Sequence, residues 1–190
     1  MTMAEGNALV NVARVEIVTE ETVPRTLTFT TADEAKYTPK VSDGKEVVLR
    51  TKNTLHAIDK TEDIQYGSDI VLTDNKFSAE VLAIVDGGTV VMDTATPTKI
   101  VGYTPPIASL AVNRIIFTTN VYTEEKDTDG TILSYFKFAF PSCKGTPTKF
   151  SFKDGTFMTP EYTIESRAKK GEGAYDLSIL TPVAFNALTA

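Results

Sequence analysis

The sequence predicts a mainly β protein, a β-sandwich or barrel-like domain flanked by one short α-helix. Apolar and polar residues alternate with a period of two along most apolar segments, and β-branched and aromatic residues dominate those segments. Only one segment carries apolar residues at helical spacing. With 190 residues, 42% of them hydrophobic and 23% charged, the chain is predicted to form a single domain over 1–190 with a substantial core.

Strands are predicted wherever runs of Val, Ile, Thr and Phe lie between turn residues. In the first half, Asp43-Gly44 is a turn signal between two such runs. The runs that we expect to form strands are Leu9–Val18, Thr26–Thr30, Val47–Leu55, Ile70–Thr73 and Thr89–Met92.

The second half shows clearer alternation. Two long apolar runs flank residues 124–130, in which Asp129-Gly130 is a strong hairpin turn signal. Because alternate residues of a strand face opposite sides, Phe136, Phe138 and Phe140 are expected to share one face. The strands expected here are Asn113–Thr123, Ile132–Phe140, a short strand through Phe150 and Phe152, Tyr162–Lys169, and Tyr175–Leu180.

One helix is expected, over Lys76–Asp86. Asp74 or Asn75 is placed to cap its N-terminus, and Gly87-Gly88 is a typical C-terminal stop. Its apolar face is expected to contain Phe77, Val81, Ile84 and Val85.

Three stretches have the least regular patterns: Ala32–Gly44, Thr94–Ala108 with three prolines, and Glu124–Gly130. Each is expected to be a loop between strands or a projecting arm.

The residues that most catalytic centres require are scarce. His56 is the only histidine and Cys143 the only cysteine, and no motif links them as a catalytic pair. Two such residues supply too few ligands for a zinc site, and one cysteine excludes an internal disulfide. The sequence contains no nucleophile elbow, no Walker-type phosphate loop and no dinucleotide-binding glycine motif.

Two charged segments are candidates for ion-binding sites, one for calcium and one for phosphate. In the acidic loop, Asp127, Asp129 and Gly130 suit positions three, five and six of a calcium loop, but position twelve is Phe136, so a solvated hairpin tip is favoured. The basic cluster Arg167, Lys169 and Lys170 alternates with apolar residues, which favours the wet face of a strand over a phosphate patch. No catalytic, cofactor-binding or metal-binding residue is therefore predicted, and no enzyme activity is expected.

Charge and hydropathy restrict the partners. The formal net charge is −6, the opposite of what a free-standing nucleic-acid binder needs, although it suits a surface past which DNA slides. Met1–Asn7 lacks the pattern of a signal peptide, and no apolar stretch is long enough to cross a bilayer, so we expect neither export nor membrane insertion.

The order of segments between Tyr66 and Leu180 resembles that of a known family. Its elements are Tyr66–Leu72, the expected helix ending at Asp86-Gly87-Gly88, a proline-rich loop, and a series of aromatic strands: Tyr103–Pro106, Arg114–Phe117, Tyr135–Pro141, Phe150–Phe152 and Tyr162–Lys169. This order and character are similar to the major tail tube proteins of tailed phages and of related phage-derived injection particles.

The resemblance implies a structural role in a virion tail, assembled in the cytoplasm of the bacterial host. Six copies would form a ring, and rings would stack through loops and arms into a hollow tube through which DNA passes only as cargo. The implied partners are further copies of the chain and the tape-measure, tail-terminator and baseplate or tip proteins. The family has no catalytic residues, so none are transferred. The alternative from the residues alone is a β-sandwich module that binds carbohydrate or a cell-surface receptor, expected to be a monomer with an exposed aromatic row.

Overall fold

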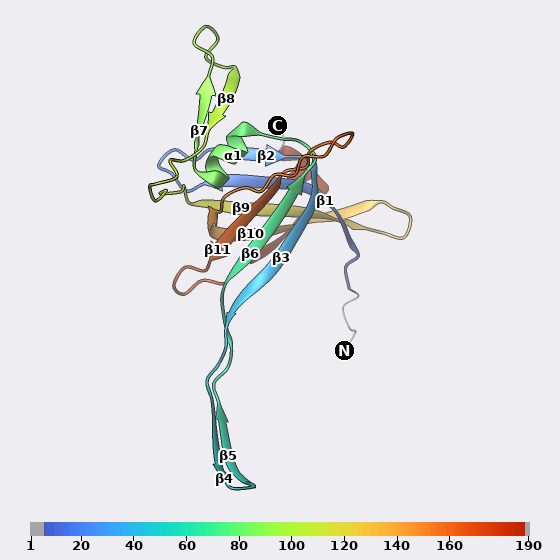
Figure 1. Cartoon of the computed structure of the whole chain (residues 1–190). Coiled ribbons are helices and arrows are strands. Elements are labelled where there is room, and N and C mark those ends of the chain that lie inside the picture. Colours follow the sequence, from blue (N-terminus) through green and yellow to red (C-terminus); the bar gives the residue numbers. More distant parts are fainter. Residues whose placement is uncertain (1–5, 189–190) are drawn as a thin grey trace.

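The computed structural model describes residues 6–188. Its body is built from antiparallel strands in the order β2-β1-β9-β10-β11-β6-β3, with β12 paired to β10 as well (Figure 1). The strands of this sheet are β1 (Leu9–Thr19), β2 (Thr26–Phe29), β3 (Ala32–Ser42), β6 (Ile64–Asp74), β9 (Phe117–Lys126), β10 (Ile132–Gly145), β11 (Glu161–Arg167) and β12 (Asp176–Leu180). The prediction of a mainly β, sandwich-like fold is confirmed.

The long strand β10 joins the two layers of the body. Its first part pairs with β9 on one side and β12 on the other, and its last two residues, Lys144 and Gly145, pair with β11. The sheet folds over at this point, so that β11, β6 and β3 face β1 and β9 across one core. The buried members of that core include Val15, Ile17, Ile70, Leu72, Phe117, Phe140, Tyr162 and Ile164.

Helix α1 (Ala79–Asp86) confirms the expected helix but starts three residues later. Ser78, rather than Asp74 or Asn75, is the N-cap, because its hydroxyl accepts from the Val81 N–H. The expected face is confirmed for Val81, Ile84 and Val85, which are buried, whereas Phe77 precedes the helix and is exposed. Gly87 ends the helix with φ 87°, a conformation that favours glycine.

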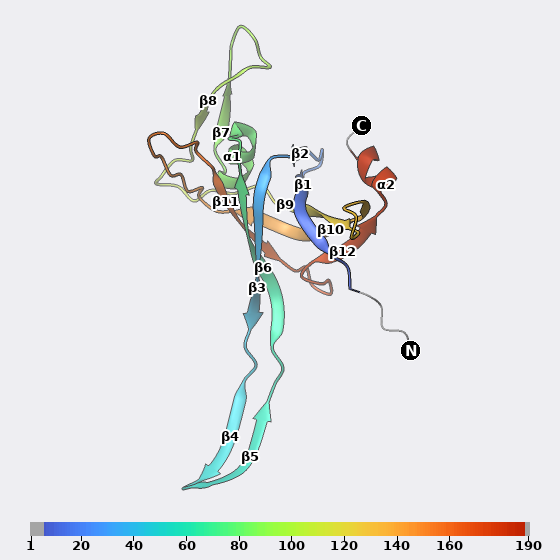
Figure 2. The same ribbon diagram turned by 90° about the vertical axis from the view of Figure 1, so that its right-hand side faces the viewer.

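Two hairpins leave the body on opposite sides (Figure 2). Strands β4 (Glu46–Thr51) and β5 (Thr54–Lys60) form a two-stranded sheet of their own, and strands β7 (Thr89–Met92) and β8 (Ile100–Thr104) form another. The β4–β5 hairpin continues outward from β3 and β6, and we call residues 45–61 the arm.

Four expectations about the elements were wrong. Val47–Leu55 is not one strand, because Lys52 turns with φ 51° and splits it into β4 and β5. Ala32–Gly44 is not irregular, because residues 32–42 form β3, an edge strand whose few apolar residues hide its pattern. Phe150 and Phe152 lie outside any strand and stack on each other at 6.3 Å. A second helix, α2 (Pro182–Ala187), was not expected, although Thr181-Pro182 is a helix-start signal.

The burial pattern of β11 and the turn between β9 and β10 confirm two other expectations. Tyr162, Ile164 and Ser166 share the buried face of β11, as their alternation predicts. The Asp129-Gly130 turn joins β9 and β10, with Gly130 at φ 86°. No helix within residues 6–188 combines the length and apolar character needed to cross a membrane. The expectation about a leader peptide rests largely on residues 1–5, which lie outside the described part of the chain.

Candidate assembly surfaces

His56 and Cys143, the candidate catalytic residues of the sequence, lie far apart in the structure. His56 lies on β5 in the exposed arm, whereas Cys143 is buried in the core of the body. Burial raises the pKa of the Cys143 thiol to about 11, despite a hydrogen bond from the Thr119 hydroxyl at 3.4 Å. The thiol is therefore protonated and shielded at neutral pH, which makes it a poor nucleophile.

The acidic loop is the turn of the β9–β10 hairpin. The Asp127 and Thr131 backbones hydrogen-bond across it at 2.9 Å, and the Asp129 carboxylate accepts the Thr131 N–H at 2.8 Å. That backbone bond lowers the pKa of Asp129. Phe136 is buried within β10. In residues 6–188, no group of three or more His, Cys, Asp and Glu is placed to hold a metal ion.

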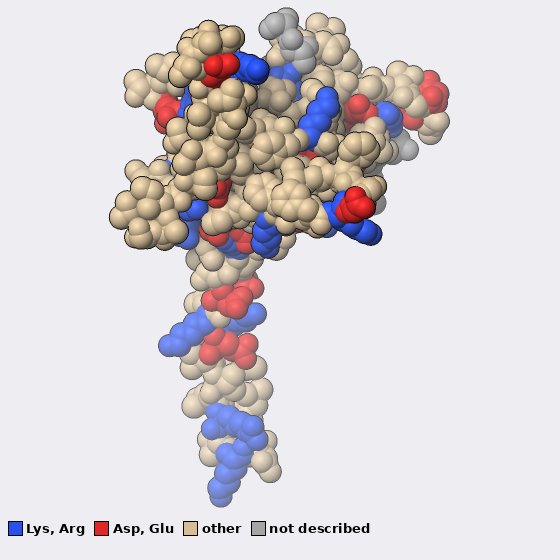
Figure 3. All heavy atoms as spheres, turned by 45° about the horizontal axis from the view of Figure 1, so that its top comes forward, with Lys and Arg blue, Asp and Glu red and all other residues tan. Residues whose placement is uncertain are grey.

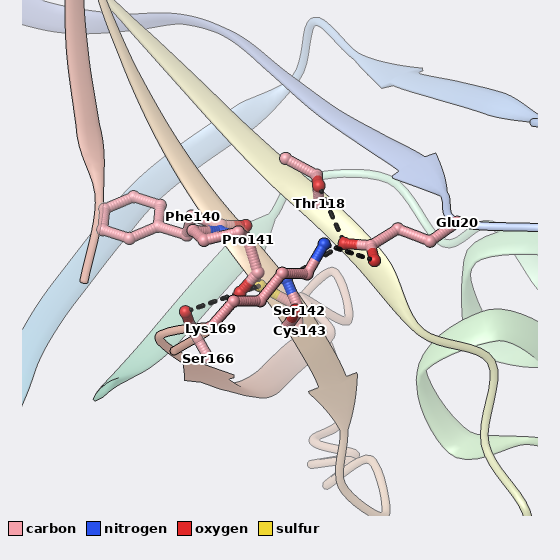
Figure 4. A network of polar contacts seen from close by, with 8 residues as sticks. All are labelled: Glu20, Thr118, Phe140, Pro141, Ser142, Cys143, Ser166 and Lys169. Atoms are coloured by element: carbon pink, nitrogen blue, oxygen red, sulfur yellow. Dashed lines mark hydrogen bonds and ion pairs between the residues drawn. The ribbon is translucent and has the colours of Figure 1, made fainter. Parts of the chain in front are cut away.

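Lys169, one of the three residues of the basic cluster, belongs to a network of polar contacts where β10 bends (Figure 4). Its ammonium group lies 3.1 Å from one oxygen of the Glu20 carboxylate, while the other oxygen accepts the Ser142 N–H at 3.1 Å and the Thr118 hydroxyl at 3.2 Å. Ser142 has φ 50° and lies in the bulge of β10. Glu20 therefore holds the strand at the point where it passes between the two layers.

The pKa of Glu20 reflects this position. Partial burial raises it, but hydrogen bonds from Ser142, Lys169 and Thr118 and the charge of Lys169 outweigh that effect, so that the pKa is lowered. The nearby Ser166 hydroxyl donates to the Pro141 carbonyl at 2.9 Å and closes the corner from β11.

The arm is a two-stranded hairpin that exposes apolar residues on both of its faces. Both faces carry apolar residues: Val48 and Ile58 are cross-strand partners on one face, and Val47 and Leu49 lie on the other. All are about half exposed, between 46% and 60%, together with Leu55. A two-stranded hairpin is at best marginally stable alone, and strands with apolar residues on both faces are typical of strands covered on both faces. The arm therefore has the composition of a buried element, but nothing in the described part of the chain covers it.

The charges of the arm are divided along its length. Basic side chains gather at its far end, and acidic and basic side chains mix nearer the body (Figure 3). Arg50 and Lys52 lie at that end, where the Arg50 guanidinium donates to the Lys52 carbonyl at 2.7 Å. Residues 47–58 contain no Asp or Glu, so the far part of the arm is a basic and apolar surface.

An apolar groove of about 330 Å³ opens on the body between the two layers. Its lining residues come from β1, β9 and β10, from β3 and β6, and from Tyr175 just before β12. Tyr37 stacks on Phe140 at 5.5 Å and meets Tyr175 edge-on at 5.8 Å. Val12, Val121 and Phe138 contribute to the lining of the groove.

The opposite face of the same strands is covered by α2. Phe185 stacks on Tyr135 at 3.8 Å and packs against Tyr122. Beneath it, Arg14 forms a buried ion pair with Glu16 at 2.6 Å, and the same carboxylate accepts the Tyr122 hydroxyl at 2.9 Å. Burial and then this hydrogen bond raise the pKa of Tyr122. One face of these strands is therefore covered by α2, whereas the other face opens into the groove.

Sheet edges and a second projection complete the candidate surfaces. In the part of the chain that the structure describes, β2, β3 and β12 each pair with one strand only, so each leaves one edge open. Thr94–Ala108, expected as a loop or arm, contains β8, and residues 94–99 form the tip of the β7–β8 hairpin. Such edges and tips are where β proteins add neighbours.

The functional surfaces were largely missed by sequence reasoning. Within the arm, Val47–Leu55 was expected to be one strand, although the Lys52-Asn53 pair inside this apolar run was a usable turn signal. The groove has no such signal, because its lining residues come from segments as distant as Val12 and Tyr175.

Comparison with solved structures gives a weak likeness. No family model and no curated protein matches this chain. Among solved structures, it is similar to a chain from "Cryo-EM structure of the anti-feeding prophage (AFP) baseplate, 6-fold symmetrised", with a TM-score of 0.38 and 12% identity. The alignment covers 95% of this chain and 97% of that chain.

Proposed function

We propose that this protein is a non-enzymatic structural subunit that self-assembles into rings, six copies to a ring. The rings stack into a tube like a phage tail tube, through which DNA is delivered. One observation carries the proposal: the arm exposes apolar residues on both faces, and no part of residues 6–188 covers them. In an assembly, a second copy of the chain would cover these residues. An isolated copy leaves them exposed to water.

Two further features support assembly into rings. The open edges of β2, β3 and β12 offer backbone N–H and C=O groups to a neighbour, which extends the sheet from one copy to the next. The net charge of −6 per copy suits a wall that DNA passes without binding, because like charges repel. In the proposed particle, tape-measure, tail-terminator and baseplate or tip proteins would set the length and the ends of the tube, and assembly would take place in the host cytoplasm.

The test is imaging of the purified protein over a series of concentrations by negative-stain electron microscopy, with sedimentation velocity on the same samples. The expected result is rings of constant diameter with six-fold averages, and tubes at higher concentration. A sharp monomer boundary at every concentration, unchanged when the protein is co-expressed with proteins that initiate tail tubes, would overturn the proposal.

A second candidate function, the binding of carbohydrate or a cell-surface receptor, is favoured by one observation. Phe152 and Phe157 are 82% and 95% exposed, and Phe150 stacks on Phe152 at 6.3 Å and meets Phe77 in a tilted arrangement at 6.2 Å. Exposed aromatic rings are typical of recognition surfaces. Saturable binding to a glycan array by a monomer, lost on Phe152→Ala, would support this function over assembly.

A further inference from the structure

We propose that the arm of one copy docks in the apolar groove on the body of a second copy, with its basic end on the acidic β9–β10 hairpin. This inference rests on the proposed self-assembly and specifies which two surfaces meet. It assigns a role to the groove, which none of the described helices and strands fills.

The groove is suited to aliphatic side chains. Most of its lining is apolar and includes Val12, Phe138 and Phe140, whereas Asn11, Lys36 and Thr123 are the polar lining residues. Protein interiors are close-packed, so an open apolar depression of about 330 Å³ between two sheet layers is an unfilled part of the core. Filling it removes further apolar surface from water without breaking any hydrogen bond of the chain.

The arm presents the matching face. Val48 and Ile58 are directly opposite each other, and Arg50 lies two residues beyond Val48 on the same side of β4. Ile58 is 57% exposed and Leu55, the partner of Arg50, is 55% exposed. One face of the arm therefore combines aliphatic side chains with a positive charge at its far end.

Charge selects the orientation. Asn11, one of the lining residues of the groove, donates to the Glu124 carboxylate at 2.9 Å, so the groove adjoins the β9–β10 hairpin. From there the β9–β10 hairpin carries four carboxylates and one ammonium group, on Glu124, Glu125, Lys126, Asp127 and Asp129. The basic end of the arm, which has no acidic residue between positions 47 and 58, is complementary to this hairpin.

The partner must be a second copy. The arm extends away from the body in both views, so it does not reach the groove of its own chain (Figures 1 and 2). A contact between two different surfaces of the same chain is heterologous, and it repeats until it closes a ring or forms an open helical array. Docking of this kind therefore links each copy to the next in the proposed assembly.

Thiol cross-linking between two separately substituted chains tests the contact. One chain carries Ile58→Cys in the arm and the other Lys36→Cys or Tyr175→Cys at the groove, all at exposed positions. The native Cys143 is buried and does not compete. After mixing under assembling conditions, a short bismaleimide is expected to join arm and groove variants into a dimer band. The matched control is Val183→Cys on α2, which is 80% exposed on the opposite side of the same strands.

The outcomes separate this inference from the proposed function. A cross-link yield at the two groove positions at least about fivefold above the Val183→Cys control supports docking. Normal rings or tubes with no such excess overturn docking and leave self-assembly standing. Monomers of the unsubstituted protein at every concentration overturn the proposed function, and the groove then has no second copy to bind.

Discussion

Removal of the arm separates assembly from folding. Replacement of residues 46–60 by a short glycine link is feasible because the Thr61 N–H donates to the Lys45 carbonyl at 3.0 Å, which places the two ends of the deletion side by side. Strands β4 and β5 pair only with each other among the described elements. We therefore expect the body to fold without them and the midpoint of thermal unfolding to stay within a few degrees of that of the full chain.

The expected loss of assembly follows from the exposed apolar surface. Full burial of a Val, Leu or Ile side chain contributes about 1.5–3 kcal/mol. The five arm residues Val47, Val48, Leu49, Leu55 and Ile58 are between 46% and 60% exposed. Covering the exposed half of each contributes about 1 kcal/mol, or about 5 kcal/mol for one arm. Since about 1.4 kcal/mol is a factor of ten in affinity, deletion raises the concentration at which the protein associates by at least about a thousandfold.

Light scattering and sedimentation velocity over a concentration series measure that threshold. Circular dichroism on the same samples checks the fold of the body. Association of the deletion variant at a concentration within about threefold of the full chain would refute the reasoning, because the apolar faces of the arm would then contribute nothing to assembly. A matched variant, Val183→Ala on α2, is expected to leave the threshold unchanged.

Three further predictions concern the body. Gly145→Ala places a Cβ about 2.0 Å from the Val85 carbonyl oxygen, so we expect a loss of about 1–3 kcal/mol in urea unfolding, whereas Gly102→Ala, whose nearest neighbour is 3.7 Å away, loses none. Phe185→Ala removes a buried ring that stacks on Tyr135 and packs against Tyr122, and we expect about 3–5 kcal/mol lower stability by the same method, with Phe185→Leu intermediate. Because the pKa of Glu20 is lowered in the fold, its contribution is present above its ordinary pKa of 4.5 and is lost as the pH falls through the lowered value. The unfolding free energies of the native chain and Glu20→Gln should therefore converge at acid pH, and a difference that grows there would contradict the assignment.

Local sequence pattern was sufficient for those parts of the fold whose structure depends on residues close together in the sequence. The alternation of Tyr162, Ile164 and Ser166 was sufficient to place them on the buried face of β11. A two-residue turn signal was sufficient to place the β9–β10 hairpin, and helical spacing to find α1. In each case the periodicity of one segment reports directly which side faces the core.

The same local pattern failed where exposure removed the contrast on which it depends. β3 is an edge strand with few apolar residues, so its sequence has no apolar face to detect. The arm has apolar residues on both faces, so alternation does not distinguish its strands, and its turn lies within an apolar run. The candidate surfaces were therefore the least predictable part of the chain.

The sequence by itself determined a β-rich chain with one main helix, an acidic balance and no assembled catalytic motif. Only the tertiary structure decided that β10 passes between two layers at a bulge held by Glu20 and Ser142, and that the arm projects uncovered. It also decided that residues as distant as Val12, Tyr37 and Tyr175 form one groove. The physical reason is that periodicity encodes which side of a segment is apolar, whereas a groove or an uncovered arm depends on which other segments pack against it.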